Sequence, residues 1–353
     1  MKKIIRFLLF IVLVLMIISA QLRFRPWLFI LFIFGVCIST FFHETVHAIV
    51  YLLYGIRVDG VICSPFAITF HPQFKISILR PQFILSGGEV IPDLFMGKSF
   101  VYCLNLTKKS LIIAPLASLA EGFLALTVFI ATKNELFFFV FLSSGYIVLS
   151  SFISENDVYG DFVAYKKIKG EKLFFLNIYC TNALIIHGGE ALSTIYKTFN
   201  TLFVNPSLSS LSESEQQNYN NLVFLYVSLK LAGYAISIDE IENNINGLPL
   251  TKYSCSEEES LIALRSVCCN KNHSKDELMS LFVSSSQFGD SIQISYLVKQ
   301  AETFYGICDN SEYLAEHFSE YVENLDVHNL YFSGWGKLEK DILRKCLSHK
   351  CCP

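Results

Sequence analysis

The sequence predicts an all-α polytopic membrane protein with about four transmembrane helices, a short β-like or re-entrant loop region and a soluble α-helical C-terminal domain. Three observations support this fold class. The 353 residues are 52% hydrophobic and only 17% charged. Mean hydropathy is +0.44, which is more apolar than an ordinary soluble protein. Apolar runs of membrane length precede residue 154, whereas the chain after them becomes polar.

Four apolar runs are expected to span the bilayer, at about residues 5–20, 27–54, 110–131 and 136–153. As a helix the second run is roughly 42 Å long, so it crosses a hydrocarbon core of about 30 Å with tilt or overhang. Only residues 133–135 separate the last two runs, which predicts a helical hairpin. The first run follows Lys2 and Lys3, and we expect it to remain as an uncleaved anchor.

Basic residues set the expected orientation in the membrane. Lys2, Lys3 and Arg6, at the start of the chain, favour a cytosolic N-terminus, and six basic residues within 56–109 favour a cytosolic position for that segment. Arg23 and Arg25 oppose this arrangement. On balance we expect an integral membrane protein with both termini in the cytosol. Four spans beginning with Met-Lys-Lys suit a bacterial cytoplasmic membrane.

The chain is expected to divide into a membrane domain, 1–165, and a cytosolic helical domain, 166–353. S-x-x-E capping boxes predict helix starts at Ser237, Ser254 and Ser274, because serine and glutamate satisfy the orphan amides of a first turn. Spacings of 17 and 20 residues between these starts indicate short helices stacked in series, as in an irregular helical repeat. This domain is expected to engage a protein partner.

Charge and cysteine content exclude two classes of protein. A formal net charge of −3 without a basic-aromatic motif excludes nucleic-acid binding. The eleven cysteines are odd in number, and Cys37, Cys63 and Cys103 lie in apolar or membrane-adjacent sequence. A reduced, cytosol-facing chain is therefore favoured over a disulfide scaffold.

The stretch FFHETVHAIVYLLYG, residues 41–55, places ionisable groups in a membrane run, where such groups usually mark a functional site. On a helix His43 and His47 share a face and can bind one metal, while Glu44 lies about 100° around. The pattern predicts one Zn²⁺ per chain, with Glu44 as the general base acting on a zinc-activated water. The alternative is a structural cluster without metal.

A catalytic zinc has three protein ligands and one open position. No further histidine follows at short spacing, so the third ligand must come from elsewhere. The segment 151–162, after the fourth run, supplies Glu155, Asp157 and Asp161. His43 lies about 24 Å into a helix that enters from outside, so it and the end of the fourth run are both expected near the inner side of the membrane.

Four patterns together resemble the site-2-protease type of intramembrane zinc metalloprotease. They are the apolar HExxH helix, GGEVIP at 87–92, APLASLAEG at 114–122, and an Asn-Asp segment ending in Gly160-Asp161. The resemblance covers roughly residues 35–165, and HExxH is its specific element. The family's Asp-Gly pair is Asp161-Phe162 in this chain.

The resemblance implies a membrane metalloendopeptidase that hydrolyses membrane-associated proteins or peptides, in regulated proteolysis or peptide maturation. It implies His43, His47 and Asp161 as zinc ligands, with Asp157 as the alternative to Asp161, and Glu44 as general base. Gly87 and Gly88 are expected to line the substrate path, because paired glycines allow close backbone approach and an extended substrate can pair with a strand edge. The alternative function is a catalytically degenerate peptide-binding, immunity or scaffold protein of the same fold.

Overall fold

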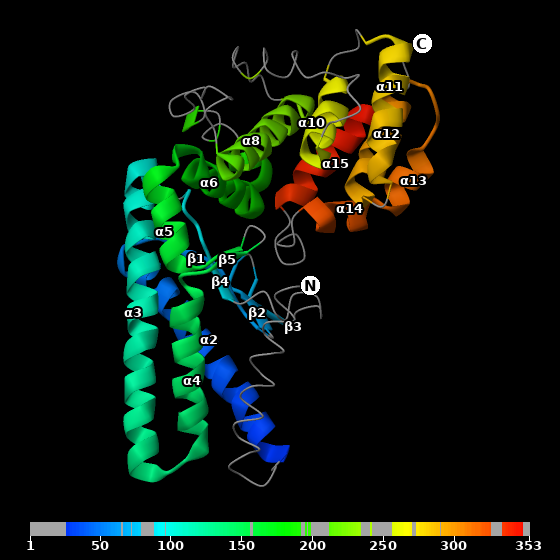
Figure 1. The fold of residues 1–353 in the computed structure, drawn as a ribbon. Coiled ribbons are helices and arrows are strands. Elements are labelled where there is room, and N and C mark those ends of the chain that lie inside the picture. The colour runs from blue at the N-terminus through cyan, green and yellow to red at the C-terminus, as the bar shows by residue number, and fades with distance from the viewer. Residues whose placement is uncertain are drawn as a thin grey trace. The chain divides into compact units, whose positions relative to one another are not determined.

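The computed structural model divides the chain into two compact units, Met1–Gly170 and Glu171–Pro353 (Figure 1). The structure describes residues 26–64, 66–71, 73–78, 88–95, 97–155, 158–191, 195, 197–198, 212–233, 241, 256–269, 273–289, 291–325 and 334–348. The first expected span, 5–20, lies outside these residues, as do Gly87 and Asp157.

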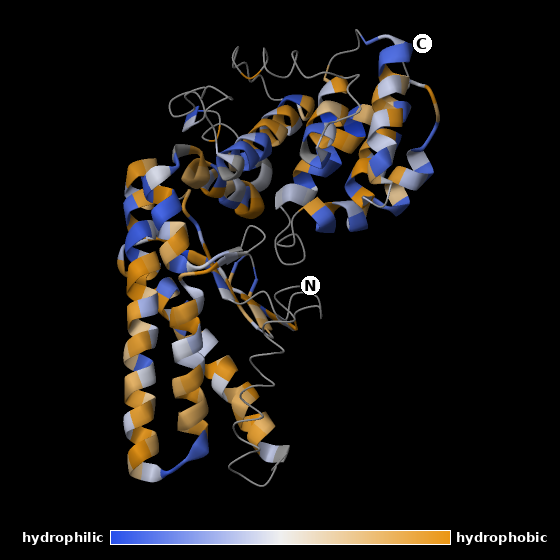
Figure 2. Ribbon diagram, in the orientation of Figure 1, coloured by the Kyte–Doolittle hydropathy of each residue, from blue (hydrophilic) through white to orange (hydrophobic). Residues whose placement is uncertain are grey.

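Three helices form the centre of the first unit: α2 (Pro26–Leu53), α3 (Phe100–Thr132) and α4 (Glu135–Ser150), each packed against the other two. By length and composition α2 and α3 can cross a membrane, and Figure 2 shows their largely hydrophobic ribbons. The 16-residue α4 is about 24 Å long, shorter than a hydrocarbon core of about 30 Å. Within the described residues the structure therefore supports two candidate spans, and the four expected spans are not confirmed.

Local sequence explains the hairpin between α3 and α4. The Ser99 side chain accepts a hydrogen bond from the Tyr102 amide at the start of α3, and the Asn134 side chain accepts one from the Leu136 amide at the start of α4. Between the helices Lys133 adopts a left-handed conformation, with φ of 56°. Such caps satisfy amides that a helix leaves unpaired, and the hairpin expected at residues 133–135 is present.

Small residues allow the three helices to approach closely. A Cβ added to Gly35 of α2 would lie 2.9 Å from the backbone of Phe139 in α4, and one added to Gly122 of α3 would lie 3.3 Å from the Ser144 side chain. Close packing of this kind is the main source of helix association inside a bilayer, because lipid offers no hydrophobic driving force between apolar helices.

A four-stranded antiparallel sheet interrupts the helical unit, so the all-α prediction is wrong at this point. Its strands are β1 (Val58–Cys63), β2 (Phe66–Thr69), β3 (Lys75–Ile78) and β4 (Gly88–Pro92), in the order β3-β2-β1-β4. The expected β-like region includes β4, which contains most of the GGEVIP stretch at 87–92 and pairs with β1 in the register Val61↔Val90. Because β4 lies at the end of this order, its second edge has no partner strand among the described residues.

A charged clamp holds the strand ends together. Arg57 donates to both carboxylate oxygens of Asp59, at 2.6 and 3.0 Å, and to Asp93 at 2.9 Å. Asp59 and Asp93 are both buried. Arg57 directly precedes β1, Asp59 lies in β1 and Asp93 directly follows β4, so these ion pairs hold the end of β4 beside the start of β1.

The second unit is helical, as predicted. Its elements are α6 (Lys172–His187), η2 (Gly188–Ala191), α8 (Glu213–Leu231), α10 (Glu257–Val267), α11 (Lys275–Ser285), η4 (Ser286–Phe288), α12 (Ile292–Phe304), α13 (Ser311–Glu316), α14 (Phe318–Leu325) and α15 (Gly334–Ser348). Successive helices pack as neighbours, α6 with α8, α8 with α10 and α10 with α12. The C-terminal α15 then returns against α6, α8, α12 and α14.

Capping boxes begin three of these helices. The expected box at Ser274 is confirmed, with Glu277 as its partner. The start expected at Ser254 is wrong by two residues, because Ser256 caps α10 with Glu259. A further box at Ser212 begins α8 inside a segment whose polar composition resembles a linker, and Ser237 lies outside the described residues.

A buried ion pair joins α15 to the helical stack. Arg265 of α10 is fully buried and donates to both carboxylate oxygens of Glu339 in α15, each at 2.8 Å. It also donates to Gln300 at 2.9 Å and to the Tyr321 hydroxyl. Burial lowers the pKa of Arg265, but the Glu339 carboxylate outweighs burial and raises it above its usual value. The arginine is therefore charged in the core and depends on its partner.

Candidate metal centre

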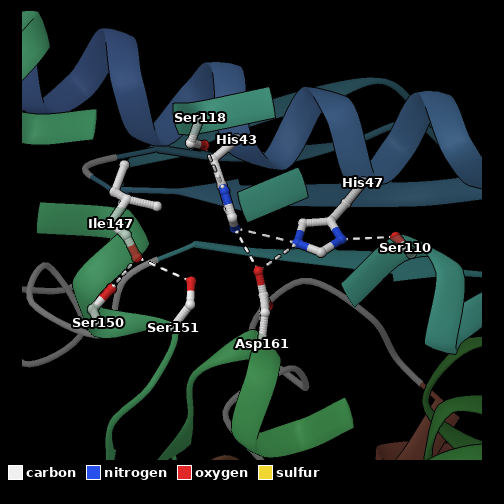
Figure 3. A network of polar contacts seen from close by, with 8 residues as sticks. All are labelled: His43, His47, Ser110, Ser118, Ile147, Ser150, Ser151 and Asp161. Atoms are coloured by element: carbon white, nitrogen blue, oxygen red, sulfur yellow. Dashed lines mark hydrogen bonds and ion pairs between the residues drawn. The ribbon is translucent and has the colours of Figure 1, made fainter. Parts of the chain in front are cut away.

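The helix α2 brings His43 and His47 onto one face, one turn apart. Both imidazoles are buried. Their Nε2 atoms lie 3.2 Å apart, and the two rings are nearly perpendicular, at 81°. Figure 3 shows both rings turned so that their Nε2 atoms meet. The spacing of four residues therefore produces the convergence that the sequence predicted.

Asp161 is the third member of this cluster. Its Oδ2 atom lies 3.0 Å from Nε2 of His43 and 3.3 Å from Nε2 of His47. Within the described part of the chain, these three side chains form a group whose ligand atoms all lie within 4.8 Å of one another, close enough to bind one metal ion. Asp161 is the first residue of α5 (Asp161–Gly170), which packs against α3.

The chain reaches this position through a tight reversal after α4. The hydroxyls of Ser150 and Ser151 both donate to the Ile147 carbonyl, at 2.8 and 3.0 Å, and finish α4 (Figure 3). The short hairpin of β5 (Ser154–Glu155) and β6 (Val158–Tyr159) then returns the chain.

The start of α5 is joined directly to the end of α4. The amides of Phe162 and Val163 donate to the Ser151 carbonyl, at 3.0 and 3.4 Å. The amides at the start of α5, which have no partner within that helix, therefore hydrogen-bond to a carbonyl at the end of α4 that also has none within its own helix. This junction needs a glycine at position 160, because a Cβ there would lie 2.2 Å from the Ser150 carbonyl oxygen.

The separations of the three donor atoms fit a zinc ion. A tetrahedral zinc with bonds of about 2.0–2.1 Å has ligand atoms about 3.3 Å from one another, and the separations between Nε2 of His43, Nε2 of His47 and Oδ2 of Asp161 are 3.0–3.3 Å. Oδ2 of Asp161 is also buried without an aligned hydrogen-bond donor. Two nitrogen lone pairs and a carboxylate at this range repel one another unless a cation or a proton lies between them.

Asp161 has the charge that a metal ligand requires. Burial raises the pKa of the Asp161 carboxyl, but the imidazoles of His43 and His47 outweigh burial and hold that pKa well below its usual range. The carboxylate is therefore ionised at neutral pH. Ligation requires the carboxylate form of an acidic residue.

Helix α3 supplies a hydroxyl to each histidine. The Nδ1 atom of His43 lies 2.9 Å from Oγ of Ser118, and the Nδ1 atom of His47 lies 2.7 Å from Oγ of Ser110 (Figure 3). Both serines are fully buried. When Nδ1–H donates to the serine oxygen, Nε2 retains a lone pair directed at the cluster. Partners of this kind orient metal-binding histidines.

Glu44 lies between the cluster and the sheet. It is buried on α2, and its side chain packs against Gly88, where a Cβ would lie 2.2 Å from Oε1 of Glu44. The carboxylates of Asp161 and Glu89 are close enough to interact with it electrostatically. The start of β4 is thus directly beside the expected general base.

The structure brings together His43, His47 and Asp161 and sets Gly88 against Glu44, the residue that follows His43 on α2. Sequence reasoning missed Ser110 and Ser118. The sequence did contain a weak signal for them. Ser110 and Ser118 are eight residues apart, which is about 12 Å along a helix, so each can reach one of two neighbouring imidazoles on a facing helix. No family model, curated protein or solved structure matches this chain, so the geometry of the site carries the functional argument.

Proposed function

We propose that this protein is an integral membrane zinc metalloprotease of the site-2-protease type. The observation that carries the proposal is the cluster of buried His43 and His47 with half-buried Asp161 in an apolar helical bundle, where Glu44 is the buried residue next to His43 on α2. Buried polar groups are costly among lipid-facing helices, and they persist where they perform a function.

Each residue of the site has a distinct role in the proposed hydrolysis. His43, His47 and Asp161 would hold one zinc ion. When bound, zinc supplies Lewis-acid chemistry that polarises a peptide carbonyl and makes water more acidic. Glu44 accepts a proton from the attacking water and then gives it to the departing amine. One carboxylate therefore carries out both proton transfers that peptide hydrolysis requires.

The edge of β4 suits an extended peptide substrate. A transmembrane helix hides its carbonyls in its own hydrogen bonds, so a substrate must unwind before it is attacked. An unwound segment can pair with a strand edge through backbone hydrogen bonds. Gly88 begins β4 beside Glu44, so a segment paired there passes the general base. We therefore propose membrane-associated proteins or peptides as substrates.

We propose that the second unit lies in the cytosol and engages the substrate or a protein partner. Its polar helical stack packs as a unit of its own, separated from the first at Gly170. Ending the chain after Gly170 is expected to spare zinc binding and change which substrates are cleaved. The test measures zinc content and the cleavage of a panel of substrates, on both the truncated and the full-length protein.

The second candidate is a non-hydrolytic relative that binds peptides in the membrane or acts as an immunity factor or scaffold. The sequence favours it at one point, because the Asp-Gly pair of the family is replaced by Asp161-Phe162. Intact Glu44 opposes it, since a binding protein has no need for a buried general base.

The test compares three detergent-purified full-length proteins: wild type, Glu44→Gln and Glu135→Gln. Glu135→Gln is the matched control, because Glu135 begins α4 and the chain reaches Asp161 only after the other end of that helix. About one zinc per chain is expected in all three, with hydrolysis of single-span model substrates in wild type and Glu135→Gln alone. Absence of zinc from wild type refutes the metal site. Zinc with equal hydrolysis by Glu44→Gln refutes the assigned base, and zinc without hydrolysis in any sample favours the binding protein.

A further inference from the structure

We infer that the adjoining ends of α2 and α3 bind the phosphate headgroup of an anionic phospholipid, held by the ammonium groups of Lys98 and Lys109. This site rests on the proposed membrane location and is independent of the zinc site. The C-terminal end of α2 lies beside the start of α3, where the Tyr102 hydroxyl donates to the Tyr54 carbonyl at 2.7 Å. The two candidate spans therefore meet the membrane surface together at this point.

The two lysines reach this place from different positions along α3. Lys98 directly precedes the Ser99 cap, whereas Lys109 lies nine residues after the first residue of the helix, or about 14 Å along it. A helical side chain leans toward the N-terminus of its helix, and a lysine extends its ammonium group toward water. The ammonium group of Lys109 accordingly lies at the end of α2, 4.7 Å from the centre of the Tyr54 ring.

Lys98 brings its own ammonium group to the same turn. Its Nζ atom lies 5.3 Å from the centre of the Tyr102 ring, and a Cβ added to Gly55 would lie 3.7 Å from this atom. Because Tyr54 and Gly55 are consecutive residues, both ammonium groups lie beside one short turn. A ring face attracts a cation within about 6 Å but has no net charge, so it positions the lysines without neutralising them.

The positive charge of this site has no counterion within the described part of the chain. Among those residues no carboxylate lies within ion-pair distance of Lys98 or Lys109. The neighbouring Arg57 differs, because Asp59 and Asp93 both pair with it. Both lysines are exposed. Exposed basic residues next to a membrane span attract anionic lipids.

The surface beside the lysines is apolar, which favours a lipid over a soluble anion. Leu52 and Leu53, directly before Tyr54, are 57% and 78% exposed. Val101, directly before Tyr102, is 59% exposed. Tyrosines are typical at the headgroup level of a membrane. A ligand that covers this surface therefore combines a negative headgroup with apolar chains, as an anionic phospholipid does and inorganic phosphate does not.

The test measures binding of short-chain phosphatidylglycerol to the detergent-purified full-length protein by native mass spectrometry. Phosphatidylcholine of the same chain length is the comparison without net charge. Lys98→Gln and Lys109→Gln are each expected to weaken phosphatidylglycerol binding about fivefold, and the double variant about 25-fold, with phosphatidylcholine binding unchanged. Lys133→Gln is the matched control, because Lys133 is an exposed lysine at the other end of α3.

A charge-preserving variant separates headgroup binding from altered packing. Lys98→Arg combined with Lys109→Arg is expected to retain phosphatidylglycerol binding, since arginine also binds phosphate. Equal binding by wild type and the double glutamine variant overturns the inference, as does an equal loss in Lys133→Gln or loss of binding in the double arginine variant. Inorganic phosphate or an acidic peptide that displaces the lipid at equal concentration also overturns it. Zinc content and peptide hydrolysis are measured on the same samples, so failure of the metalloprotease proposal is recorded separately.

Discussion

Substitution of Gly160 by alanine tests whether the junction between α4 and α5 sets the position of the third ligand. The added Cβ would lie 2.2 Å from the Ser150 carbonyl oxygen and 2.7 Å from Cα and C of Ser151. These are backbone atoms, so no side-chain rotation relieves the clash. Normal contacts require more than 3 Å, so α5 must move by about 1 Å at its first turn.

A movement of this size is large for a metal ligand. Coordination distances hold to about ±0.2 Å, and Asp161 is the next residue after the clash. We expect zinc affinity to fall about tenfold to a hundredfold, which corresponds to a loss of about 1.4–2.7 kcal/mol in binding free energy. Overpacking adds a stability loss of about 1–3 kcal/mol.

The assay is zinc competition on full-length protein, with thermal unfolding recorded in the presence of chelator. Gly145→Ala is the control, because a Cβ at Gly145 in α4 meets no atom within 4 Å. Alanine there is expected to leave zinc affinity unchanged and to stabilise the helix slightly. Wild-type zinc affinity in Gly160→Ala would show that α5 reaches the site by another route and would refute this reasoning.

Three further perturbations address the base, the core of the second unit and pH. Gly88→Ala places a Cβ 2.2 Å from Oε1 of Glu44, so that flexible side chain must rotate away; we expect cleavage to fall at least about tenfold with zinc content unchanged, and loss of zinc would contradict this. Glu339→Ala leaves the Arg265 charge buried and unpaired, which is expected to cost about 3–5 kcal/mol in urea unfolding of the second unit, whereas a loss under 1 kcal/mol would argue against a buried pair. The depressed pKa of Asp161 means that the metal-free folded state gains stability above the unfolded pKa of about 3.9 and loses it as pH falls through the folded value; Asp161→Asn should lose this dependence, and an unchanged pH profile of unfolding would contradict it.

Much of the fold followed from local pattern. The α3–α4 hairpin rests on Asn134 and its neighbours, and the start of α11 rests on the Ser274 capping box. Such features are satisfied within one helical turn, so adjacent residues suffice to predict them. The start of α10 was misplaced because Ser254 and Ser256 both precede a run of glutamates, and only packing distinguishes the two frames. The β-like region was expected, but strand β1 was not, because it is buried along its whole length and lacks alternation.

The sequence by itself determined that His43 and His47 converge, because four residues make one helical turn and the convergence needs no other part of the chain. It also restricted the third ligand to a short acidic segment. Only the tertiary structure decided that Asp161 completes the triangle, since that position depends on Gly160 allowing α5 to meet the end of α4. The serines of α3 entered the site for the same reason: their distance from the histidines is a property of helix packing, which depends on side-chain volumes along the whole interface and is not written in the spacing of any one segment.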